Sequence, residues 1–261
     1  MILGVDHVVI AVRDLDDAAA ALGRELGLDV AEGGHHLALG TRNALAWLGD
    51  SYLELLAVTD PALAARSWIG APALAALARG GGVATYALAS DDIAAEVRRL
   101  HARGSNLIGP LPGERLRPDG QAERWQLALL PELGPDRPPF LIEHLAGSPE
   151  WRPEARDARA LQRHPAGRVR LRGLEVPVGD PDTSAAAYAA EIGIALAAGP
   201  APSSGRRARI GGQAVALVVA RSIAGVATGP ATIALSSDEG GRRAADLLGC
   251  RFVIGPEAEP A

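Results

Sequence analysis

One pattern recurs along the chain: a short apolar strand, an aspartate, an alanine-rich helix and a glycine. It appears first at 11–28 as AVRDLDDAAAALGRELGL and returns at 177–194 as PVGDPDTSAAAYAAEIGI, an offset of 166 residues. Asp14 is placed to cap the first helix, because its side chain accepts hydrogen bonds from free backbone N–H groups, and Gly27 is placed to end it. A chain that restarts the same order is built from repeated supersecondary units.

The first unit continues with two strand-like runs, NALAWL and YLELLAV, which Gly49-Asp50 joins as a tight hairpin. The order restarts after Gly80-Gly81-Gly82. This second unit has a strand at 83–89, an amphipathic helix at 93–103, and strands at 125–130 and 140–145. We therefore expect strand–helix–strand–strand–strand units that work in pairs.

The C-terminal part contains a shorter version of the same order. The copy at 177–194 is followed by what reads as a truncated fourth unit, with a strand ATIALS, a cap at Asp238, a helix reaching Leu248 and a strand CRFVI. An arginine- and proline-rich stretch separates the two halves. We expect a paired domain over 1–147, a linker over 148–168 and a degenerate pair over 169–261.

Composition excludes several classes of function. All 26 basic residues are arginine, which excludes Schiff-base and P-loop lysine chemistry. The net charge of −5 is interspersed, so nucleic acid is not an expected partner. The single cysteine, Cys250, cannot form an internal disulfide. No apolar run is long enough to span a membrane and no signal sequence is visible, so we expect a cytoplasmic protein without a membrane partner.

Four segments carry a resemblance to the vicinal oxygen chelate superfamily, and within it to the glyoxalase-like domain family. They are DHVVIAVRDLDDA at 6–18, GTRNALAWLGDSYLELLAV at 40–58, RPDGQAERWQLALLPE at 117–132 and PFLIEHL at 139–145. The resemblance implies an α+β fold in which repeated βαβββ modules pair into curved mixed sheets around a cleft. It also implies that a metal and a small substrate occupy that cleft, and that no nucleotide cofactor is used.

The resemblance implies a metal-ligand set with one position missing. Carried over by position, the ligands are His7 in the first strand, Glu54 in YLELL and Glu143 in FLIEH. The fourth position, opposite His7 in the second module, falls on Ala84 or Thr85, and neither replaces an imidazole. Three ligands are enough for zinc, manganese, nickel or iron with open coordination positions. Glu54 and Glu143, preferentially Glu143, would also act as the catalytic carboxylates.

The two glutamates are also notable without any family. Each stands in the middle of an apolar strand, where burying a lone carboxylate costs several kcal/mol unless it is paired, protonated or bound to a cation. The alternative is that strand alternation turns both toward solvent. For His7, the alternative is a structural histidine bonded to a backbone carbonyl. His144 follows Glu143 directly and must face the other side of its strand.

Substrate-binding candidates border the expected cleft. They are Arg42, Asn43, Arg117, Arg124 and Trp125. Guanidinium groups there would bind a carboxylate or phosphate, and the indole would form an apolar wall. The alternative is that Arg117 decorates a turn and Trp125 fills the core. His35 and His36 are expected in a loop before the next strand, within reach of a ligand.

These observations lead to an enzyme of the lyase, isomerase or dioxygenase type that acts with a divalent metal on a small oxygenated, anionic metabolite. The missing histidine favours a different class, a metal-free protein of the bleomycin-resistance type that sequesters a small molecule. A third alternative is that the duplicated halves serve as a scaffold for interaction or for a homodimer. The metal content of the purified protein would separate the first two.

Overall fold

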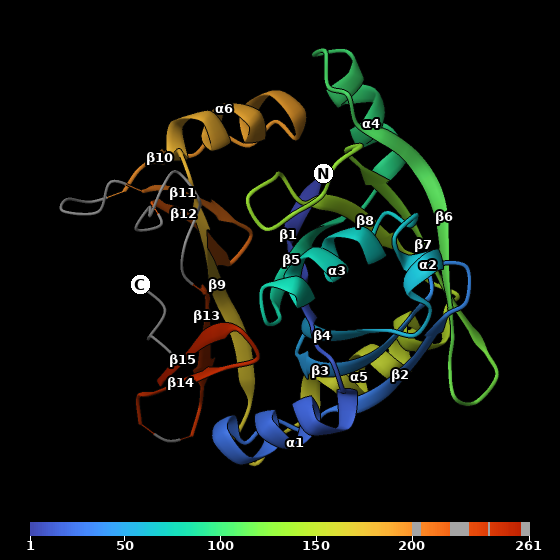
Figure 1. The fold of residues 1–261 in the computed structure, drawn as a ribbon, viewed down its shortest axis with the longest axis vertical. Helices are drawn as coiled ribbons and strands as arrows, with labels where there is room; N and C mark the ends of the chain where they lie inside the picture. Colours follow the sequence, from blue (N-terminus) through green and yellow to red (C-terminus); the bar gives the residue numbers. More distant parts are fainter. Residues whose placement is uncertain (200–204, 220–229, 240, 257–261) are drawn as a thin grey trace.

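The computed structural model describes residues 1–199, 205–219, 230–239 and 241–256. In these residues the chain forms two curved sheets that lie side by side (Figure 1). One is a closed barrel built by the N-terminal half, and the other is a seven-stranded sheet built by the C-terminal half. The expected class, α+β with curved mixed sheets, is confirmed.

The barrel has the strand order β1-β4-β3-β2-β6-β7-β8-β5. Strand β1 pairs in parallel with β4 and antiparallel with β5, so it stands at the junction of the two modules. The strands are β1 (Ile2–Ala11), β2 (Ala31–His36), β3 (Thr41–Leu48), β4 (Ser51–Val58), β5 (Gly82–Ser90), β6 (Ile108–Leu116), β7 (Ala122–Leu129) and β8 (Phe140–His144). Its helices are α1 (Leu15–Leu26), α2 (Pro61–Ala64), α3 (Gly70–Ala78) and α4 (Ile93–His101).

The local signals in the first module act as expected. Asp14 accepts hydrogen bonds from the backbone N–H groups of Asp16 and Asp17, both at 2.9 Å, and so begins α1. Gly27 ends the helix in the left-handed conformation, with φ 65°. The hairpin at Gly49-Asp50 forms with Leu48 opposite Ser51. Strand β2 is an addition, because the sequence GGHH was expected to be a loop.

The second sheet has the strand order β10-β11-β12-β9-β13-β15-β14. Its elements are β9 (Val169–Val178), α6 (Pro181–Glu191), β10 (Ala197–Ala198), β11 (Arg206–Ile210), β12 (Gln213–Val219), β13 (Ala231–Ser237), β14 (Arg243–Leu247) and β15 (Cys250–Pro256). Along the chain between β8 and β9, residues 148–168 contain a 3₁₀ turn, η1 (Pro149–Trp151), and a helix, α5 (Pro153–Leu161). Residues 257–261 of the expected C-terminal region lie outside the described residues.

The helix expected between Asp238 and Leu248 is wrong, apart from residue 240, which is not described. The chain instead forms strand β14, which pairs antiparallel with β15 through the two-residue turn Leu248-Gly249. Both turn residues have positive φ, 52° and 68°, as a tight hairpin with right-handed twist requires. Asp238 accepts a hydrogen bond from the backbone N–H of Arg168 at 2.7 Å and caps no helix.

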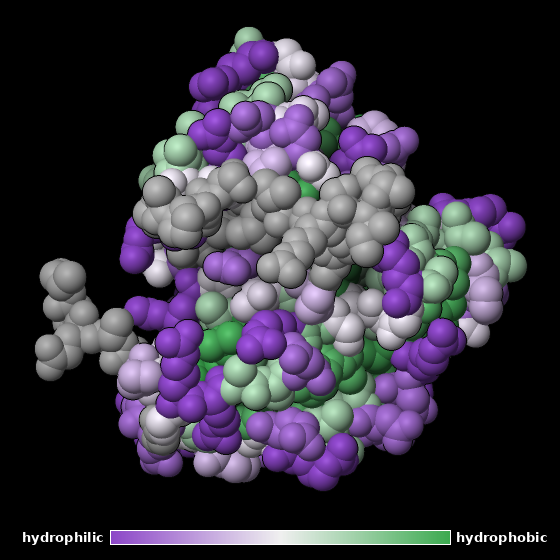
Figure 2. All heavy atoms as spheres, turned by 60° about the vertical axis from the view of Figure 1, so that its left-hand side comes forward, coloured by the Kyte–Doolittle hydropathy of each residue, from purple (hydrophilic) through white to green (hydrophobic). Residues whose placement is uncertain are grey.

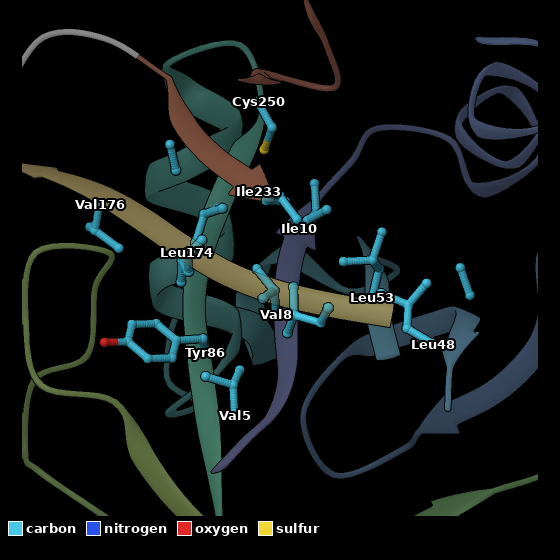
Figure 3. Packing of buried hydrophobic residues seen from close by; sticks show 14 of the residues in the cluster. Val5, Val8, Ile10, Leu48, Leu53, Tyr86, Leu174, Val176, Ile233 and Cys250 are labelled. Atoms are coloured by element: carbon cyan, nitrogen blue, oxygen red, sulfur yellow. The ribbon is translucent and has the colours of Figure 1, made fainter. Parts of the chain in front are cut away.

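The main hydrophobic core lies where the barrel meets the second sheet. Val8 and Ile10 of β1 and Leu53 of β4 pack there with Leu174 of β9 and Ile233 of β13, all five fully or almost fully buried (Figure 3). The hydroxyl groups of Tyr86 and Tyr188 hydrogen-bond to each other in the same core. Cys250 also lies here, and burial raises the pKa of its thiol to about 12. Helix α6 lies above the second sheet in Figure 1.

Apolar surface is visible among hydrophilic side chains on the side of the molecule that carries the second sheet (Figure 2). None of the helices in the described ranges is long and apolar enough to cross a membrane.

The polar residues that line a cavity lie inside the barrel, on the face of β1 opposite the main hydrophobic core.

Candidate active site

Buried polar residues of the N-terminal half line a cavity inside the barrel. Its volume is about 40 Å³, which is room for roughly three water molecules. The residues that line it come from strands of both modules and from the segments that follow them: His7, His36, Leu39, Asn43, Leu45, Tyr52, Glu54, Trp68, Ile69, Arg115, Glu123, Trp125, Phe140, Ile142, His144 and Glu150.

His7 and Glu54 meet at the centre of the cavity. They lie on neighbouring parallel strands, with Glu54 opposite Val9, so both side chains point to the interior. His7 Nε2 lies 3.5 Å from Glu54 Oε2, and the two side chains are only 4% and 9% exposed. The imidazole also stacks on Tyr52, with ring centroids 4.6 Å apart. The structure therefore brings together two of the three residues that the sequence assigned to a metal.

Asp6 contacts His7 on the side of the imidazole that points away from Glu54. His7 Nδ1 hydrogen-bonds Asp6 Oδ1 at 2.6 Å, and His144 Nε2 approaches the same carboxylate at 3.1 and 3.2 Å. A shift in register between Val5 and His7 marks an irregularity of β1 here. Burial alone would raise the pKa of Asp6, but the two histidines outweigh it and hold this pKa well below its usual range. Asp6 is therefore an anion that fixes the orientation of His7.

Glu54 has two further polar neighbours. Asn43 donates a hydrogen bond from Nδ2 to Glu54 Oε1 at 2.6 Å. His36 Nε2 lies 4.0 Å from the same oxygen, and its Nδ1 lies 3.1 Å from Thr41 Oγ1. Burial lowers the pKa of His36 to about 4, although Glu54 acts in the opposite direction. His36 is therefore neutral at physiological pH.

Arg115 supplies a buried donor to the cavity wall. It is 4% exposed, and its Nη2 donates to Glu150 Oε2 at 2.5 Å. Its Nη1 and the Oδ1 of Asn43 are buried without a partner among the described residues. A Cβ on Gly33 would lie 2.8 Å from Arg115 Nη1 and 2.2 Å from Asn43 Oδ1. Arg115 Nη1 and Asn43 Oδ1 are thus a donor and an acceptor that lie unpaired in the buried wall beside Gly33.

Glu143 is not part of this cavity, which corrects the expectation that it is the third ligand and the preferred catalytic carboxylate. Phe140, Ile142 and His144 are the residues of β8 that line the cavity. Glu143 faces the opposite side of the strand, where its Oε2 accepts a hydrogen bond from the backbone N–H of Ile93 at 2.8 Å. Its carboxylate satisfies the N-terminus of α4. The residue of β8 that contacts the Asp6 carboxylate is His144.

The position of the second module that aligns with His7 stays a prediction, since either Ala84 or Thr85 would leave it without an imidazole. Both residues are fully buried in β5. Across the antiparallel pair of β1 and β5, the strand neighbour of His7 is Ala87 and that of Val9 is Thr85.

The predicted substrate-binding residues divide into two groups. Asn43 and Trp125 line the cavity. Arg42 points to the outer side of β3, Arg124 is 60% exposed near Glu114, and Arg117 binds Glu150 and Asp119. The arginine that reaches the cavity is Arg115, which stands two residues before Arg117 and therefore on the same face of the chain.

The segment expected to be a linker closes one side of the site. Glu150 of η1 binds Arg115 inside the cavity, and Trp151 stacks on His144 with ring centroids 3.8 Å apart. The guanidinium of Arg159 in α5 lies over the rings of Trp47 and Trp151, at 4.2 and 4.9 Å. Sequence reasoning missed this contribution, because an arginine- and proline-rich stretch carries no periodicity that points to a barrel.

The described donor set lacks the third expected metal ligand. Glu143 lies outside the cavity. The donor atoms left facing each other are His7 Nε2 and Glu54 Oε2, because Asp6 holds His7 Nδ1 and Asn43 holds Glu54 Oε1. Within the ranges that the structure describes, no group of three or more His, Cys, Asp or Glu side chains is arranged to hold a metal ion. The geometry is instead that of three side chains in a row. The carboxylate of Asp6 contacts the imidazole of His7, and the imidazole faces the carboxylate of Glu54.

An outer cavity adjoins the site. It has a volume of about 240 Å³ and shares Leu39, Trp68 and Trp125 with the inner cavity. Gly113 lies against the indole of Trp125, where a Cβ would approach its Nε1 to 2.2 Å. The outer cavity, which we call the vestibule, is mostly apolar and is placed to receive the remainder of a molecule whose polar end enters the barrel.

The glyoxalase-like domain family profile matches residues 5–192, which is most of the chain. The chain belongs to this family, and the resemblance to the vicinal oxygen chelate superfamily is confirmed.

One solved structure shares the fold over almost the whole chain. A hypothetical protein from Staphylococcus aureus is 16% identical, with a TM-score of 0.78 over 98% of this chain and all of that one, so the whole fold is shared. Two methylmalonyl-CoA epimerases match a little over half of the chain, with lower TM-scores. The one from Streptomyces coelicolor, in complex with 2-nitronate-propionyl-CoA, is 22% identical (TM-score 0.43; 57% of this chain, 99% of that chain). The one from Mycobacterium tuberculosis is 23% identical (TM-score 0.41; 55% and 89%). No curated protein matches the chain in sequence.

Proposed function

We propose that this protein is an acid–base enzyme of the isomerase or lyase type that moves a proton at a carbon next to a carbonyl group. The observation that carries the proposal is a row of three buried side chains, Asp6, His7 and Glu54, beside a small cavity. His7 Nδ1 lies 2.6 Å from Asp6 Oδ1, and His7 Nε2 lies 3.5 Å from Glu54 Oε2. Buried carboxylates and imidazoles in a cavity are the usual components of general acid–base catalysis.

The hydrogen bonds give each group a role. Asp6 holds Nδ1 of His7, and Nε2 of His7 faces the Glu54 carboxylate at 3.5 Å. In the proposed mechanism the Nε2–H of His7 is the acid, and the carboxylate of Glu54 beside it is the base.

The proposed step is an enolisation. Glu54 takes the proton from the substrate carbon, the electron pair of the C–H bond forms the new carbon–carbon double bond, and His7 gives its Nε2 proton to the carbonyl oxygen. Asp6 stabilises the imidazolium before the transfer. Return of the protons to the same or a different carbon gives exchange or isomerisation, and loss of a leaving group from the enol gives the lyase outcome.

Arg115 and Asn43 support a small oxygenated substrate. The unpartnered Nη1 of Arg115 is a donor for a carbonyl or carboxylate oxygen, and the Oδ1 of Asn43 is an acceptor for a hydroxyl. A cavity of about 40 Å³ admits only the reacting end of such a molecule. The vestibule would hold an apolar remainder.

Solvent hydrogen exchange tests the proposal. Dihydroxyacetone, glyceraldehyde, pyruvate and 2-oxobutyrate are incubated with the protein in D₂O, and loss of the C–H signal is followed by NMR. We expect exchange for at least one compound, and a loss of about 10²-fold or more in Glu54→Gln, the usual worth of a general base. Glu143→Gln is the matched control, because it removes the same charge outside the cavity. Equal losses in the two variants contradict the proposal.

Aromatic side chains favour a second function, the metal-free binding of a small molecule without chemistry. Trp68, Trp125 and Phe140 line the inner cavity, and Trp68 packs against Phe140 with ring centroids 5.1 Å apart. Such a wall would hold a planar or apolar ligand. Binding that survives in Glu54→Gln, with no exchange of any compound by the wild type, would favour this function.

A further inference from the structure

A separate cavity lies outside the barrel, at its junction with the second sheet. Its volume is about 450 Å³, within the range of small-molecule sites. The start of β1 and the β3–β4 hairpin form one wall, and the start of β9 forms the other. Three arginines line it, Arg156 of α5 and Arg170 and Arg172 of β9. We call this cavity the arginine groove.

The groove exists because β9 is longer than its neighbour. Strand β12 pairs with β9 only from Gly173 to Val178, so β12 leaves the edge of β9 at Arg170–Arg172 uncovered. Gln213, the first residue of β12, closes one end by accepting from the Val5 backbone N–H at 2.7 Å and donating to Ser51 Oγ at 2.9 Å. The barrel and the second sheet are thus joined firmly beside the opening.

Arg170 is held in place with most of its donors free. Its guanidinium lies on the hairpin turn at Gly49, where a Cβ would come within 2.7 Å of Nη1. Its one hydrogen bond among the described residues is a long contact of 3.4 Å with the carbonyl of Val169. Glycine is therefore required at position 49 for two reasons. The hairpin turn needs its positive φ of 79°, and the absence of a Cβ leaves room for the Arg170 guanidinium.

Few carboxylates face the three guanidinium groups. Arg156 lies 4.0 Å from Asp50, whose side chain is 85% exposed. Within the described residues, neither Arg170 nor Arg172 has a carboxylate within that distance. Asp6 also borders the groove, but His7 and His144 already share its charge. Bringing like charges together in a partly enclosed space is unfavourable unless an anion compensates them.

We propose that the arginine groove binds a small organic phosphate. Guanidinium groups bind phosphate oxygens through paired N–H donors, and three of them surround the same space from two elements. Trp151 also lines the groove and offers an apolar surface for the organic part. This proposal does not depend on the chemistry proposed for the barrel.

Calorimetric titration with pyrophosphate at low ionic strength tests the proposal. The wild type is compared with Arg170→Gln/Arg172→Gln and with the control Arg242→Gln/Arg243→Gln, which removes the same charge at β14, three strands away in the sheet order. Succinate is titrated in parallel, because two carboxylates also bind arginine. Circular dichroism checks that each variant is folded.

We expect pyrophosphate to bind the wild type and the control alike, and to bind the Arg170→Gln/Arg172→Gln variant at least tenfold more weakly. Absence of binding to the wild type, or the same affinity in all three proteins, overturns the proposal. Succinate binding as tight as that of pyrophosphate overturns its assignment to phosphate.

Discussion

Replacing Asp6 with asparagine tests the arrangement that holds His7. The change keeps the shape of the side chain and removes the charge that His7 and His144 share at 2.6 and 3.1 Å. A hydrogen bond to a charged group contributes about 1.5–3 kcal/mol, and breaking a buried charge pair costs about 3–5 kcal/mol. We therefore expect Asp6→Asn to lower the free energy of unfolding by about 3–5 kcal/mol.

The pH dependence gives this prediction a sign. Because the pKa of Asp6 is lowered in the folded protein, its stabilising effect is fully present above the unfolded-state pKa of about 3.9. It is lost as the pH falls toward the folded-state value. The difference between wild type and Asp6→Asn is expected to shrink steadily as the pH falls below about 4.

Urea unfolding followed by circular dichroism between pH 3 and pH 7 measures this difference. Asp17→Asn is the control, since its side chain is exposed in the first turn of α1, and we expect it to change stability by less than about 0.5 kcal/mol. A loss below about 1 kcal/mol for Asp6→Asn at pH 7, or a loss that does not shrink in acid, would refute the reasoning.

Three other predictions follow from packing. Leu53→Ala, at a fully buried site between the sheets, should cost about 3–5 kcal/mol in urea unfolding, and a cost under 1 kcal/mol would show that the core there is loose. Gly113→Val should push the Trp125 indole toward the cavity and raise the KM of any exchange substrate more than it lowers kcat; an unchanged KM would remove the vestibule from the route. Cys250 should react with a thiol reagent only in urea, because it is 1% exposed and its pKa is about 12, and rapid labelling of the folded protein would contradict its burial.

The sequence predicted the parts of the fold that depend on local signals. Asp14 and Gly27 bound α1, and Gly49 makes the β3–β4 turn, because caps and turns are determined by a few adjacent residues. The hairpin of β14 and β15 was missed for the opposite reason. The segment before Leu248 has the residues of a helix, but pairing with β15 decides its conformation, and such long-range pairing is not visible in a short window.

The site shows the same division. His7 and Glu54 could be placed by the resemblance to the glyoxalase-like family, and Glu54 also stands as a lone carboxylate in an otherwise apolar strand. Glu143 could not, because the choice between Glu143 and His144 depends on which face of β8 turns inward, and a shift of one residue exchanges them. Arg115 and Glu150 were missed because they pair across 35 residues, from a strand and from a segment that lacks any strand pattern.

The central claim is that Asp6, His7 and Glu54 act as an acid–base set that needs no bound metal. The most direct test is elemental analysis of untagged protein by plasma mass spectrometry, combined with the deuterium-exchange assay before and after treatment with a chelator. The account predicts well under one metal ion per chain and an exchange rate that the chelator leaves unchanged. About one tightly bound zinc, manganese, nickel or iron ion per chain, with exchange lost on its removal and restored on its return, would contradict it.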